Sequence, residues 1–514
     1  MFDRIASARP DTPAVCSPDG TLLYTQLLRR ALLLASLLGE RSAPLLVYGH
    51  KQPAMVVAFL AALRRGRPYV PVDSSTPPAR IIRMLDLARP SIVVAAEALP
   101  APLVLALAER GIPVICTDPL AETLEHAETE EYALTDPTAC ADPLAYIIFT
   151  SGTTGDPKGV PIPCRSLAHF TTWLVQTQRF RPGEETFLNL APFNFDLSVM
   201  DLYGALLTRG TLFCITREEI ADPRLLFARL GGAPLTVWVS TPSFARFCLA
   251  EPRFRQAMLP LLRRFLFCGE TLPPAVAREL ARRFPDVEVW NTYGPTEATV
   301  AVTAVRVTEA MTASGHALPI GEAAVGMSVW IADPNDPLQR LPKGASGEMI
   351  IAGPQVASGY LAATPVPEQA GPFLPLPDGG IAYRTGDLGY IDTSDGLLYC
   401  GGRLDRQIKL HGYRLEIEEI EAHLRVLPGV ADAAVLTVDR DGQPDYLVAF
   451  VVPGDDAAAR GLPGETLALT QAVRAGLAER LPAYALPRRV RLLPAPPLTP
   501  NGKLDRRVLQ TRVQ

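Results

Sequence analysis

The segment 145–159 constrains the fold of this chain more than any other. It begins with Ala145-Tyr-Ile-Ile, an apolar run of β-branched and aromatic residues that is typical of a buried strand. Phe149-Thr-Ser-Gly-Thr-Thr-Gly-Asp-Pro-Lys-Gly159 follows directly. Glycines let backbone N–H groups close on an anion, hydroxyls add donors, and Lys158 adds a positive charge. The segment predicts a strand that leads into a loop for triphosphate oxygens; the plain alternative is a glycine-rich turn with a surface lysine.

Apolar strand patterns alternate with helical patterns on both sides of this segment. Such alternation is typical of parallel sheets covered by helices, so the predicted fold class is α/β with two sheets of parallel type. The predicted strands are 44–49, 68–73, 91–96, 113–117, 236–240, 264–269 and 287–291, and the predicted helices are 53–65, 103–110 and 273–284.

The pattern changes twice along the chain. From about residue 320, short strands separated by Gly, Pro and Asp predict a small β-barrel-like part of the large domain. After residue 402 a compact α+β unit is expected. Its helices are predicted at 416–425 and 467–479 and its strands at 433–437 and 446–452. A boundary near 402–406 fits these changes best and leaves a small C-terminal domain.

Composition excludes several classes of protein. A chain of 514 residues is too long for one core, and a net charge of −5 gives no electrostatic footprint for nucleic acid. The first ten residues lack the apolar core of a signal peptide, and the apolar runs are too short to cross a bilayer. Eight scattered cysteines form no CxxC pair. A cytoplasmic, soluble enzyme in a reducing compartment is expected.

Lysine usage singles out three positions. Only five of the 49 Lys and Arg residues are lysines, and Lys158, Lys409 and Lys503 lie in glycine-bearing motifs. Arg and Lys are not interchangeable where one compact donor must reach a reacting oxygen. We therefore expect a function for Lys503, whereas chance retention is sufficient to explain Lys51 and Lys343.

Ordered motifs across nearly the whole chain resemble those of the adenylate-forming superfamily, which includes acyl-CoA ligases, luciferases and the adenylation domains of nonribosomal peptide synthesis. The phosphate loop is one of these motifs, and no single motif is as specific as the ordered set. The others are Leu22-Leu-Tyr-Thr-Gln-Leu27, Arg65-Gly-Arg-Pro-Tyr-Val-Pro-Val-Asp73, Asn291-Thr-Tyr-Gly-Pro-Thr-Glu297, Tyr383-Arg-Thr-Gly-Asp387, Gly402-Arg-Leu-Asp405 and Asn501-Gly-Lys503.

Within the superfamily, five segments look most like the ligases that charge D-alanine onto a carrier protein. The segments are Asn194-Phe-Asp-Leu-Ser-Val-Met-Asp-Leu-Tyr203, Val237-Trp-Val-Ser-Thr-Pro-Ser-Phe244, Phe267-Cys-Gly-Glu270, Asn291–Val302 and Gln407-Ile-Lys-Leu-His-Gly-Tyr-Arg414.

The resemblance implies a set of ATP-binding residues. Glu297 would hold Mg²⁺, Asp387 would accept hydrogen bonds from the ribose hydroxyls with help from Arg403, and Tyr293 would stack on adenine. The remaining ATP-binding residues would be Thr150, Ser151, Gly152, Thr153, Thr154, Lys158, Glu270, Asn291, Thr292, Gly294 and Thr296.

The resemblance also implies an amino-acid pocket. Asp196 would pair with the substrate ammonium, because a buried carboxylate is costly without a partner; a helix N-terminal acid is the plain alternative. The remaining lining residues bring no charge, which suits a small apolar amino acid, with D-alanine favoured. They are Leu197, Met200, Val239, Leu266, Cys268, Thr292, Val300 and Ala301.

The implied reaction has two steps. Carboxylate attack on ATP, assisted by Lys503, would give an aminoacyl-adenylate, and a phosphopantetheine thiol would then attack its carbonyl. In the family the C-terminal domain (407–514) rotates on the core (1–402) about a hinge at 403–406, here centred on Asp405, and Gly412 would then line the thiol tunnel. The chain ends at Gln514 without a carrier domain, so we expect a carrier in trans.

Three alternatives remain open. A ligase for L-alanine, glycine or L-serine in secondary metabolism is the main one. An acyl-CoA ligase is disfavoured because Asp196 would face a fatty chain, and a non-enzymatic sensor is disfavoured because Lys503 and Glu297 are both retained.

Overall fold

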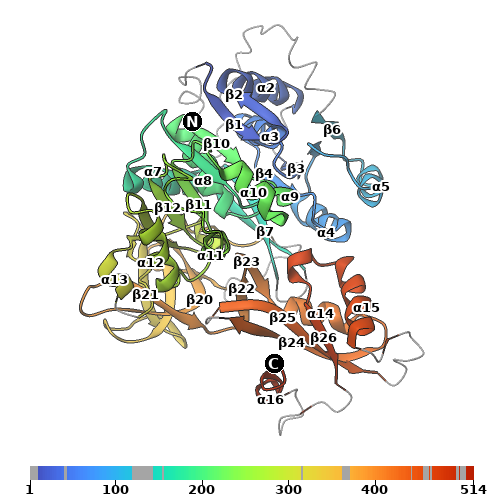
Figure 1. Cartoon of the computed structure of the whole chain (residues 1–514). Helices are drawn as coiled ribbons and strands as arrows, with labels where there is room; N and C mark the ends of the chain where they lie inside the picture. Colours follow the sequence, from blue (N-terminus) through green and yellow to red (C-terminus); the bar gives the residue numbers. More distant parts are fainter. Residues whose placement is uncertain are drawn as a thin grey trace. The chain divides into compact units, whose positions relative to one another are not determined.

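The computed structural model describes most of the chain, and its packing divides it into two units (Figure 1). The first unit comprises residues 1–74, 87–148 and 159–404, and the second comprises 75–86, 149–158 and 405–514. Each unit is considered by itself. The described residues are 10–39, 43–117, 143–152, 156–313, 316–361, 371–440, 443–454, 462–463, 466–493, 497 and 505–513.

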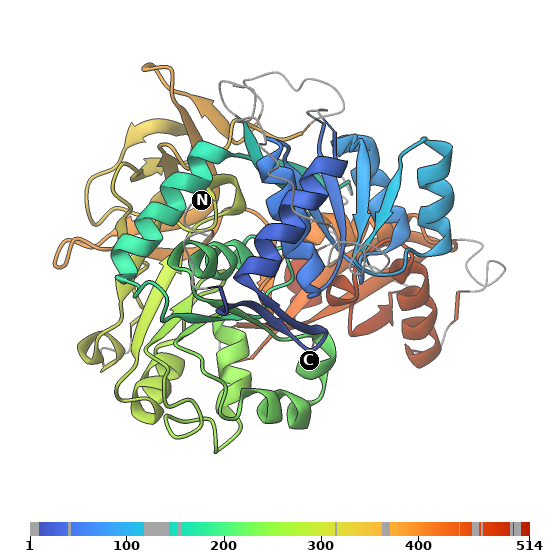
Figure 2. The same ribbon diagram turned by 90° about the horizontal axis from the view of Figure 1, so that it is seen from above.

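A six-stranded sheet has the order β6-β5-β3-β4-β7-β8, and its strands β3 to β7 pair in parallel. Helix α3 starts with a proline at its first turn and is followed by Gly66 at φ 65°, the usual start and stop signals. Figure 2 shows α2 and α3 side by side. The elements are α2 (Tyr24–Leu37), β3 (Leu45–Gly49), α3 (Pro53–Arg64), β4 (Tyr69–Asp73), α4 (Pro78–Ala88), β5 (Ile92–Ala95), α5 (Ala101–Glu109), β6 (Val114–Cys116), β7 (Leu144–Thr150) and β8 (Lys158–Pro163).

A nine-stranded sheet has the order β15-β14-β13-β12-β11-β9-β10-β1-β2. Its six central strands are parallel, and antiparallel strands close both edges. The strands are β1 (Pro13–Ser17), β2 (Gly20–Leu23), β9 (Thr186–Asn189), β10 (Thr211–Cys214), β11 (Val237–Ser240), β12 (Arg264–Phe267), β13 (Glu288–Tyr293), β14 (Thr303–Arg306) and β15 (Glu322–Ala323). The associated helices are α7 (Cys164–Gln178), α8 (Leu197–Thr208), α9 (Arg217–Ala221), α10 (Pro223–Leu230), α11 (Pro242–Leu249), α12 (Pro274–Arg283) and α13 (Glu309–Ala313). The predicted alternation of parallel strands and helices is confirmed.

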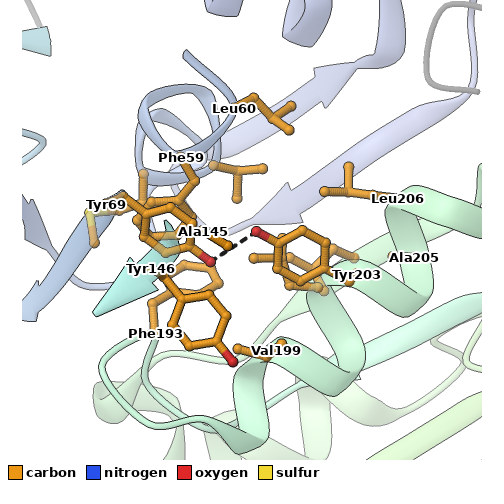
Figure 3. Packing of buried hydrophobic residues seen from close by; sticks show 14 of the residues in the cluster. Phe59, Leu60, Tyr69, Ala145, Tyr146, Phe193, Val199, Tyr203, Ala205 and Leu206 are labelled. Carbon is orange, nitrogen blue, oxygen red and sulfur yellow. Dashed lines mark hydrogen bonds between the residues drawn. The ribbon is translucent and has the colours of Figure 1, made fainter. Parts of the chain in front are cut away.

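One hydrophobic cluster joins the two sheets (Figure 3). Phe59 of α3 stacks on Tyr69 of β4, with ring centroids 4.3 Å apart, and the hydroxyls of Tyr69 and Tyr203 lie 3.0 Å apart. Tyr203 belongs to α8, which packs against β9 and β10 of the other sheet. The same cluster continues through Phe193 toward the residues that the sequence assigns to the amino-acid pocket.

A third sheet of the first unit lies where the short strands predict a β-barrel-like part, and its strands pair antiparallel. Its path is β17-β16-β18-β20-β19, with β21 also paired to β20, and the described strands follow this open path. The strands are β16 (Ser328–Asp333), β17 (Asp336–Arg340), β18 (Gly347–Ala352), β19 (Phe373–Pro375), β20 (Ile381–Ile391) and β21 (Leu398–Arg403).

The second unit contains a hairpin and a three-stranded sheet, β24-β25-β26, around one apolar cluster. The sheet and its helices agree with the predicted α+β pattern. The elements are β22 (Gln407–Leu410), β23 (Tyr413–Glu416), α14 (Ile417–Arg425), β24 (Val430–Arg440), β25 (Gln443–Pro453), α15 (Thr466–Ala478), β26 (Arg489–Leu492) and α16 (Arg506–Gln510). Within the part of the chain that the structure describes, no helix has the length and apolarity needed to cross a bilayer.

Candidate active site

Three residues predicted for the nucleotide form one buried ionic cluster. The Tyr293 hydroxyl donates to Asp387 Oδ2 at 2.6 Å, and Arg403 Nη1 donates to Asp387 Oδ1 at 2.5 Å. Asp387 and Arg403 are cross-strand partners on β20 and β21, which explains how residues 16 positions apart meet. Burial and the nearby Asp387 carboxylate raise the pKa of Tyr293 well above its usual range, so its hydroxyl stays a donor. The carboxylate is fixed from both sides and keeps lone pairs for further donors.

Other predicted nucleotide residues lie at the carboxyl ends of β12 and β13. Asn291 and Thr292 are held by backbone carbonyls: Asn291 Nδ2 donates to Pro319 at 2.7 Å and Thr292 Oγ1 to Phe267 at 2.8 Å. Glu270 Oε2 accepts from the backbone N–H of Ser243 at 3.0 Å. Ligands of open α/β sheets bind beyond the carboxyl ends of parallel strands, so this edge is a suitable location.

Glu297 is a completely buried carboxylate in the 3₁₀ turn η1 (Thr296–Ala298). Its Oε1 accepts from the Tyr360 hydroxyl at 2.7 Å. No cluster of three or more His, Cys, Asp or Glu residues suitable for a metal is found among the described residues. Mg²⁺ in nucleotide sites uses one or two carboxylates and takes its other ligands from phosphates and water, so a single carboxylate such as Glu297 fits that ion.

The turn that carries Glu297 is closely packed. A side-chain Cβ at Gly294 would lie 2.6 Å from the Ala301 Cα atom, so only glycine fits there. Thr296 is buried beside it. The glycine lets the end of β13 and the segment after η1 lie against each other.

Seven residues predicted for the amino-acid pocket belong to one hydrophobic cluster of buried residues. The seven residues are Leu197, Met200, Val239, Leu266, Cys268, Val300 and Ala301. Cys268 Sγ lies 3.6 Å from the Val300 carbonyl oxygen, so β12 and the segment after Glu297 meet at this thiol. Thr292, the eighth residue, is buried at the end of β13.

Asp196 is half-buried, and its treatment as a buried carboxylate was wrong. It lies at the N-cap of α8, where the chain enters the helix from the less buried segment 194–196. Its side chain makes no capping hydrogen bond to the helix. Asp196 is thus a helix N-terminal acid by position, as the alternative proposed, although it does not cap the helix through a hydrogen bond.

The phosphate-loop residues are grouped with the second unit. A Cβ at Gly152 would lie 2.1 Å from the Asp156 carbonyl oxygen, so the loop closes on itself only with glycine at this position. Ser151 Oγ donates to the Arg414 carbonyl oxygen at 3.1 Å. The Thr150 hydroxyl is buried and has no hydrogen-bond partner within the described part of the chain. Lys158 starts β8 and is half-buried.

The other predicted residues of the second unit are only partly described. Asp405 Oδ1 accepts from the backbone N–H of Gln407 at 3.1 Å. Gly412 has φ 88° and follows His411 at φ 51°, a sharp left-handed turn between β22 and β23. Thr153, Thr154 and Lys503 lie outside the described residues.

Lys51 is a residue that the sequence argument set aside wrongly. It is fully buried after β3, where its Nζ donates to Asn189 Oδ1 and, at 2.5 Å, to the Ala191 carbonyl oxygen. Asn189 Nδ2 in turn donates to Asp201 Oδ1 at 2.7 Å. Lys51 Nζ also lies 4.7 Å from the centroid of the Phe193 ring. The scarcity of lysine was a usable signal here, but no local motif indicated these partners.

Comparison with known proteins assigns the chain to a family. The model of the AMP-binding enzyme family matches residues 2–361, and that of the AMP-binding enzyme C-terminal domain matches residues 419–503. The chain belongs to the AMP-binding enzyme family, the adenylate-forming superfamily that its motifs resemble.

Its sequence relatives include carrier-protein ligases. It is 42% identical to the D-alanine--D-alanyl carrier protein ligase of Bacillus velezensis, over 98% of this chain and 96% of that one. It is 40% identical to the ligase of the same name from Bacillus cereus strain G9842, over 100% and 99%.

Solved structures agree with the fold. An NRPS protein containing adenylation and PCP domains, holo-PA1221, aligns with a TM-score of 0.81 at 27% identity over 100% of this chain and 84% of that one. The Vibrio cholerae adenylation domain AlmE, solved with glycyl-adenosine-5'-phosphate, aligns with a TM-score of 0.82 at 23% identity over 100% and 97%. At that identity the second likeness speaks for the fold alone.

Proposed function

We propose that this enzyme activates D-alanine with ATP and transfers it to the phosphopantetheine thiol of a separate carrier protein. The observation that carries the proposal is the full-length similarity, at 42% identity, to a D-alanine--D-alanyl carrier protein ligase. The enclosed apolar cluster beside Asp196 supports a small apolar substrate with an ammonium group.

In the first step, a carboxylate oxygen of D-alanine attacks the α-phosphorus of ATP. The bond from that phosphorus to the β,γ-diphosphate oxygen breaks, and pyrophosphate leaves. Two anions must approach each other, so the protein's task is positioning and charge neutralisation. The backbone and hydroxyls of 150–154 with Lys158 bind phosphate oxygens, and Lys503 bridges the substrate carboxylate and the α-phosphate.

The nucleotide is oriented by the cluster of Tyr293, Asp387 and Arg403. Asp387 accepts from the ribose hydroxyls while Tyr293 and Arg403 hold its carboxylate. Glu297 would hold Mg²⁺, which when bound neutralises phosphate charge. Tyr360 orients the Glu297 carboxylate through the 2.7 Å hydrogen bond.

In the second step, the carrier thiol releases its proton to solvent and its sulfur bonds to the carbonyl carbon of D-alanyl-AMP. The bond from that carbon to the phosphate oxygen breaks, and AMP leaves. We propose that residues 407–514 rotate on residues 1–402 about Asp405 between the steps, which withdraws Lys503 and brings Gly412 to the thiol path.

The test is to incubate the enzyme with ATP, Mg²⁺, D-alanine and a phosphopantetheinylated D-alanyl carrier protein of a Bacillus relative. Mass spectrometry should detect D-alanine as a thioester on the carrier, and the apo-carrier without phosphopantetheine should stay unloaded. Adenylate formation without loading of any holo-carrier would contradict the transfer half of the proposal. Preferred loading of glycine, L-alanine or L-serine would replace D-alanine by that amino acid.

A further inference from the structure

The wall of the amino-acid pocket contains two residues in an unfavourable backbone conformation. Thr299 has φ 59° and Val300 has φ 69°. Positive φ is costly for β-branched residues, so surrounding contacts must hold such a segment in place. Both side chains are buried, and Val300 and Ala301 belong to the hydrophobic cluster of the pocket. The shape of this wall therefore depends on whatever fixes its backbone.

Gln355 makes hydrogen bonds that fix the backbone of the Thr299–Ala301 segment. Its side chain is fully buried, and Nε2 donates to the Ala301 carbonyl oxygen at 2.8 Å, with the Ala298 and Thr299 carbonyl oxygens both at 3.4 Å. The Gln355 carbonyl oxygen accepts from Thr299 Oγ1 at 2.7 Å. One residue thus bonds to the strained segment through both its side chain and its backbone.

The Gln355 side-chain amide is itself held by α7. His169 Nδ1 lies 3.0 Å from Gln355 Oε1, and Ser166 Oγ donates to the carbonyl oxygen of Pro354 at 2.7 Å. Because His169 occupies the amide oxygen, the amide nitrogen must point at the carbonyls of the pocket wall. A Cβ at Gly326 would lie 3.0 Å from His169 Nε2, so glycine at this position leaves the space that the ring occupies.

We propose that Gln355 is a positioning residue that fixes the Thr299–Ala301 backbone and thereby sets the size of amino acid that the pocket accepts. This inference rests on the proposed function of the pocket. The chain of hydrogen bonds runs from α7 through His169 and Gln355 to the Ala301 carbonyl oxygen. The carbonyl oxygen of the preceding residue, Val300, lies 3.6 Å from Cys268 Sγ. Loss of the hydrogen bonds to Gln355 lets the strained turn relax and widens the pocket.

The test compares Gln355→Met, which keeps side-chain length but loses the amide, with Gln178→Met. Gln178 is a suitable control because it is equally buried on α7, and its Oε1 has no hydrogen-bond partner within the described residues. The measurement is kcat and KM in pyrophosphate exchange for D-alanine, for D-2-aminobutyrate, which is one methylene larger, and for ATP.

For Gln355→Met, the KM for D-alanine should rise about tenfold, the size expected for one buried hydrogen bond, while the KM for ATP stays within about twofold. The preference for D-alanine over D-2-aminobutyrate should fall about tenfold, which is within the range of single-methylene discrimination. Gln178→Met should change neither quantity.

A second pair of variants keeps Gln355 in place and covers the case in which Gln355→Met does not fold. His169→Asn retains an amide donor near the position of Nδ1, whereas His169→Leu removes it. The leucine variant should lose substrate discrimination and the asparagine variant should restore it. Unchanged discrimination in Gln355→Met or His169→Leu, with only stability lowered, would overturn the proposal. If the wild-type enzyme prefers another amino acid, the same comparison is made with that amino acid and its one-methylene homologue. Failure of the D-alanine assignment is then distinguishable from failure of the Gln355 proposal.

Discussion

Two buried clusters of ionisable residues in the first unit differ in what their members can still bind. The Asp387 carboxylate is fixed by Tyr293 and Arg403, and the Arg403 side chain remains 15% exposed. Lys51 and Asp201 are both 0% exposed and share Asn189 between them. Burial raises the pKa of Asp201 well above its usual range and lowers that of Lys51. A perturbed, buried charge is therefore not enough to mark a site; remaining hydrogen-bond capacity and access are also required.

The cluster of Lys51, Asn189 and Asp201 stabilises the segment that precedes Asp196. Lys51 binds the Ala191 carbonyl oxygen and lies on the ring of Phe193, both in the segment before Asp196. A buried polar group that loses its hydrogen-bond partner is costly, by about 1–3 kcal/mol, because it has left water without compensation. We expect the Lys51 cluster to act on stability and the Asp387 cluster to act on catalysis. Substitutions of Lys51 and Asp387 test this division, and those of Lys503 and Cys268 test the catalytic side further.

Lys51→Met should lower the free energy of unfolding by about 2–6 kcal/mol, since it leaves two acceptors, Asn189 Oδ1 and the Ala191 carbonyl oxygen, without their donor, and each such loss costs about 1–3 kcal/mol. The measurement is urea unfolding followed by fluorescence. The exposed Lys343→Met variant is the control and should change stability by no more than about 0.5 kcal/mol. If the Lys51→Met variant kept wild-type stability but lost pyrophosphate-exchange activity, Lys51 would act on catalysis and not on stability.

Lys503→Ala should reduce D-alanine-dependent pyrophosphate exchange by over a hundredfold, because one transition-state charge contact contributes about 3 kcal/mol. Thioester formation from supplied D-alanyl-AMP should be spared. Lys343→Ala is the control for loss of a lysine. Equal exchange rates in the Lys503→Ala and wild-type enzymes would remove Lys503 from the first step.

Asp387→Asn should raise the KM for ATP roughly ten- to hundredfold. A hydrogen bond to a charged group contributes about 1.5–3 kcal/mol, and the neutral amide would weaken the hydrogen bonds to the ribose. Its effect on unfolding should be smaller than that of Lys51→Met. The control is Asp392→Asn at a half-buried carboxylate just beyond the end of β20, and it should leave the KM for ATP unchanged. A large loss of stability with an unaltered KM for ATP would show that Asp387 stabilises the fold and does not bind the nucleotide.

Cys268→Ala should give the smallest effect. If the thiol occupies the space that an L-side chain would need, its removal should raise kcat/KM for L-alanine more than for D-alanine, by tens-fold at most, since one methyl group is worth roughly 1–3 kcal/mol. Cys248→Ala is the control, because Cys248 is a buried thiol in a different apolar cluster. Equal gains for both enantiomers would show that Cys268 does not determine chirality.

The sequence predicts the fold well where local patterns carry the information. Parallel strands and their helices follow from apolar runs bounded by Pro and Gly, as in α3. Asp387 and Arg403 could be predicted because each lies in a specific motif, and their strands place them opposite each other.

Contacts between residues far apart in the chain could not be predicted. Tyr360 and Glu297 are separated by 63 positions and Gln355 and Ala301 by 54, and no short pattern connects either pair. The half-exposed state of Asp196 was also missed, because its burial depends on how the segment before α8 packs. Such partners follow from tertiary packing, which a single sequence does not display.

The central claim is that D-alanine is the substrate of the first step. The most direct measurement is amino-acid-dependent exchange of labelled pyrophosphate into ATP by the wild-type enzyme, with D-alanine, L-alanine, glycine and L-serine compared by kcat/KM. We predict the highest value for D-alanine and at least about tenfold lower values for the others, from single-group discrimination in a small pocket. A higher kcat/KM for L-alanine, glycine or L-serine would contradict the D-alanine assignment.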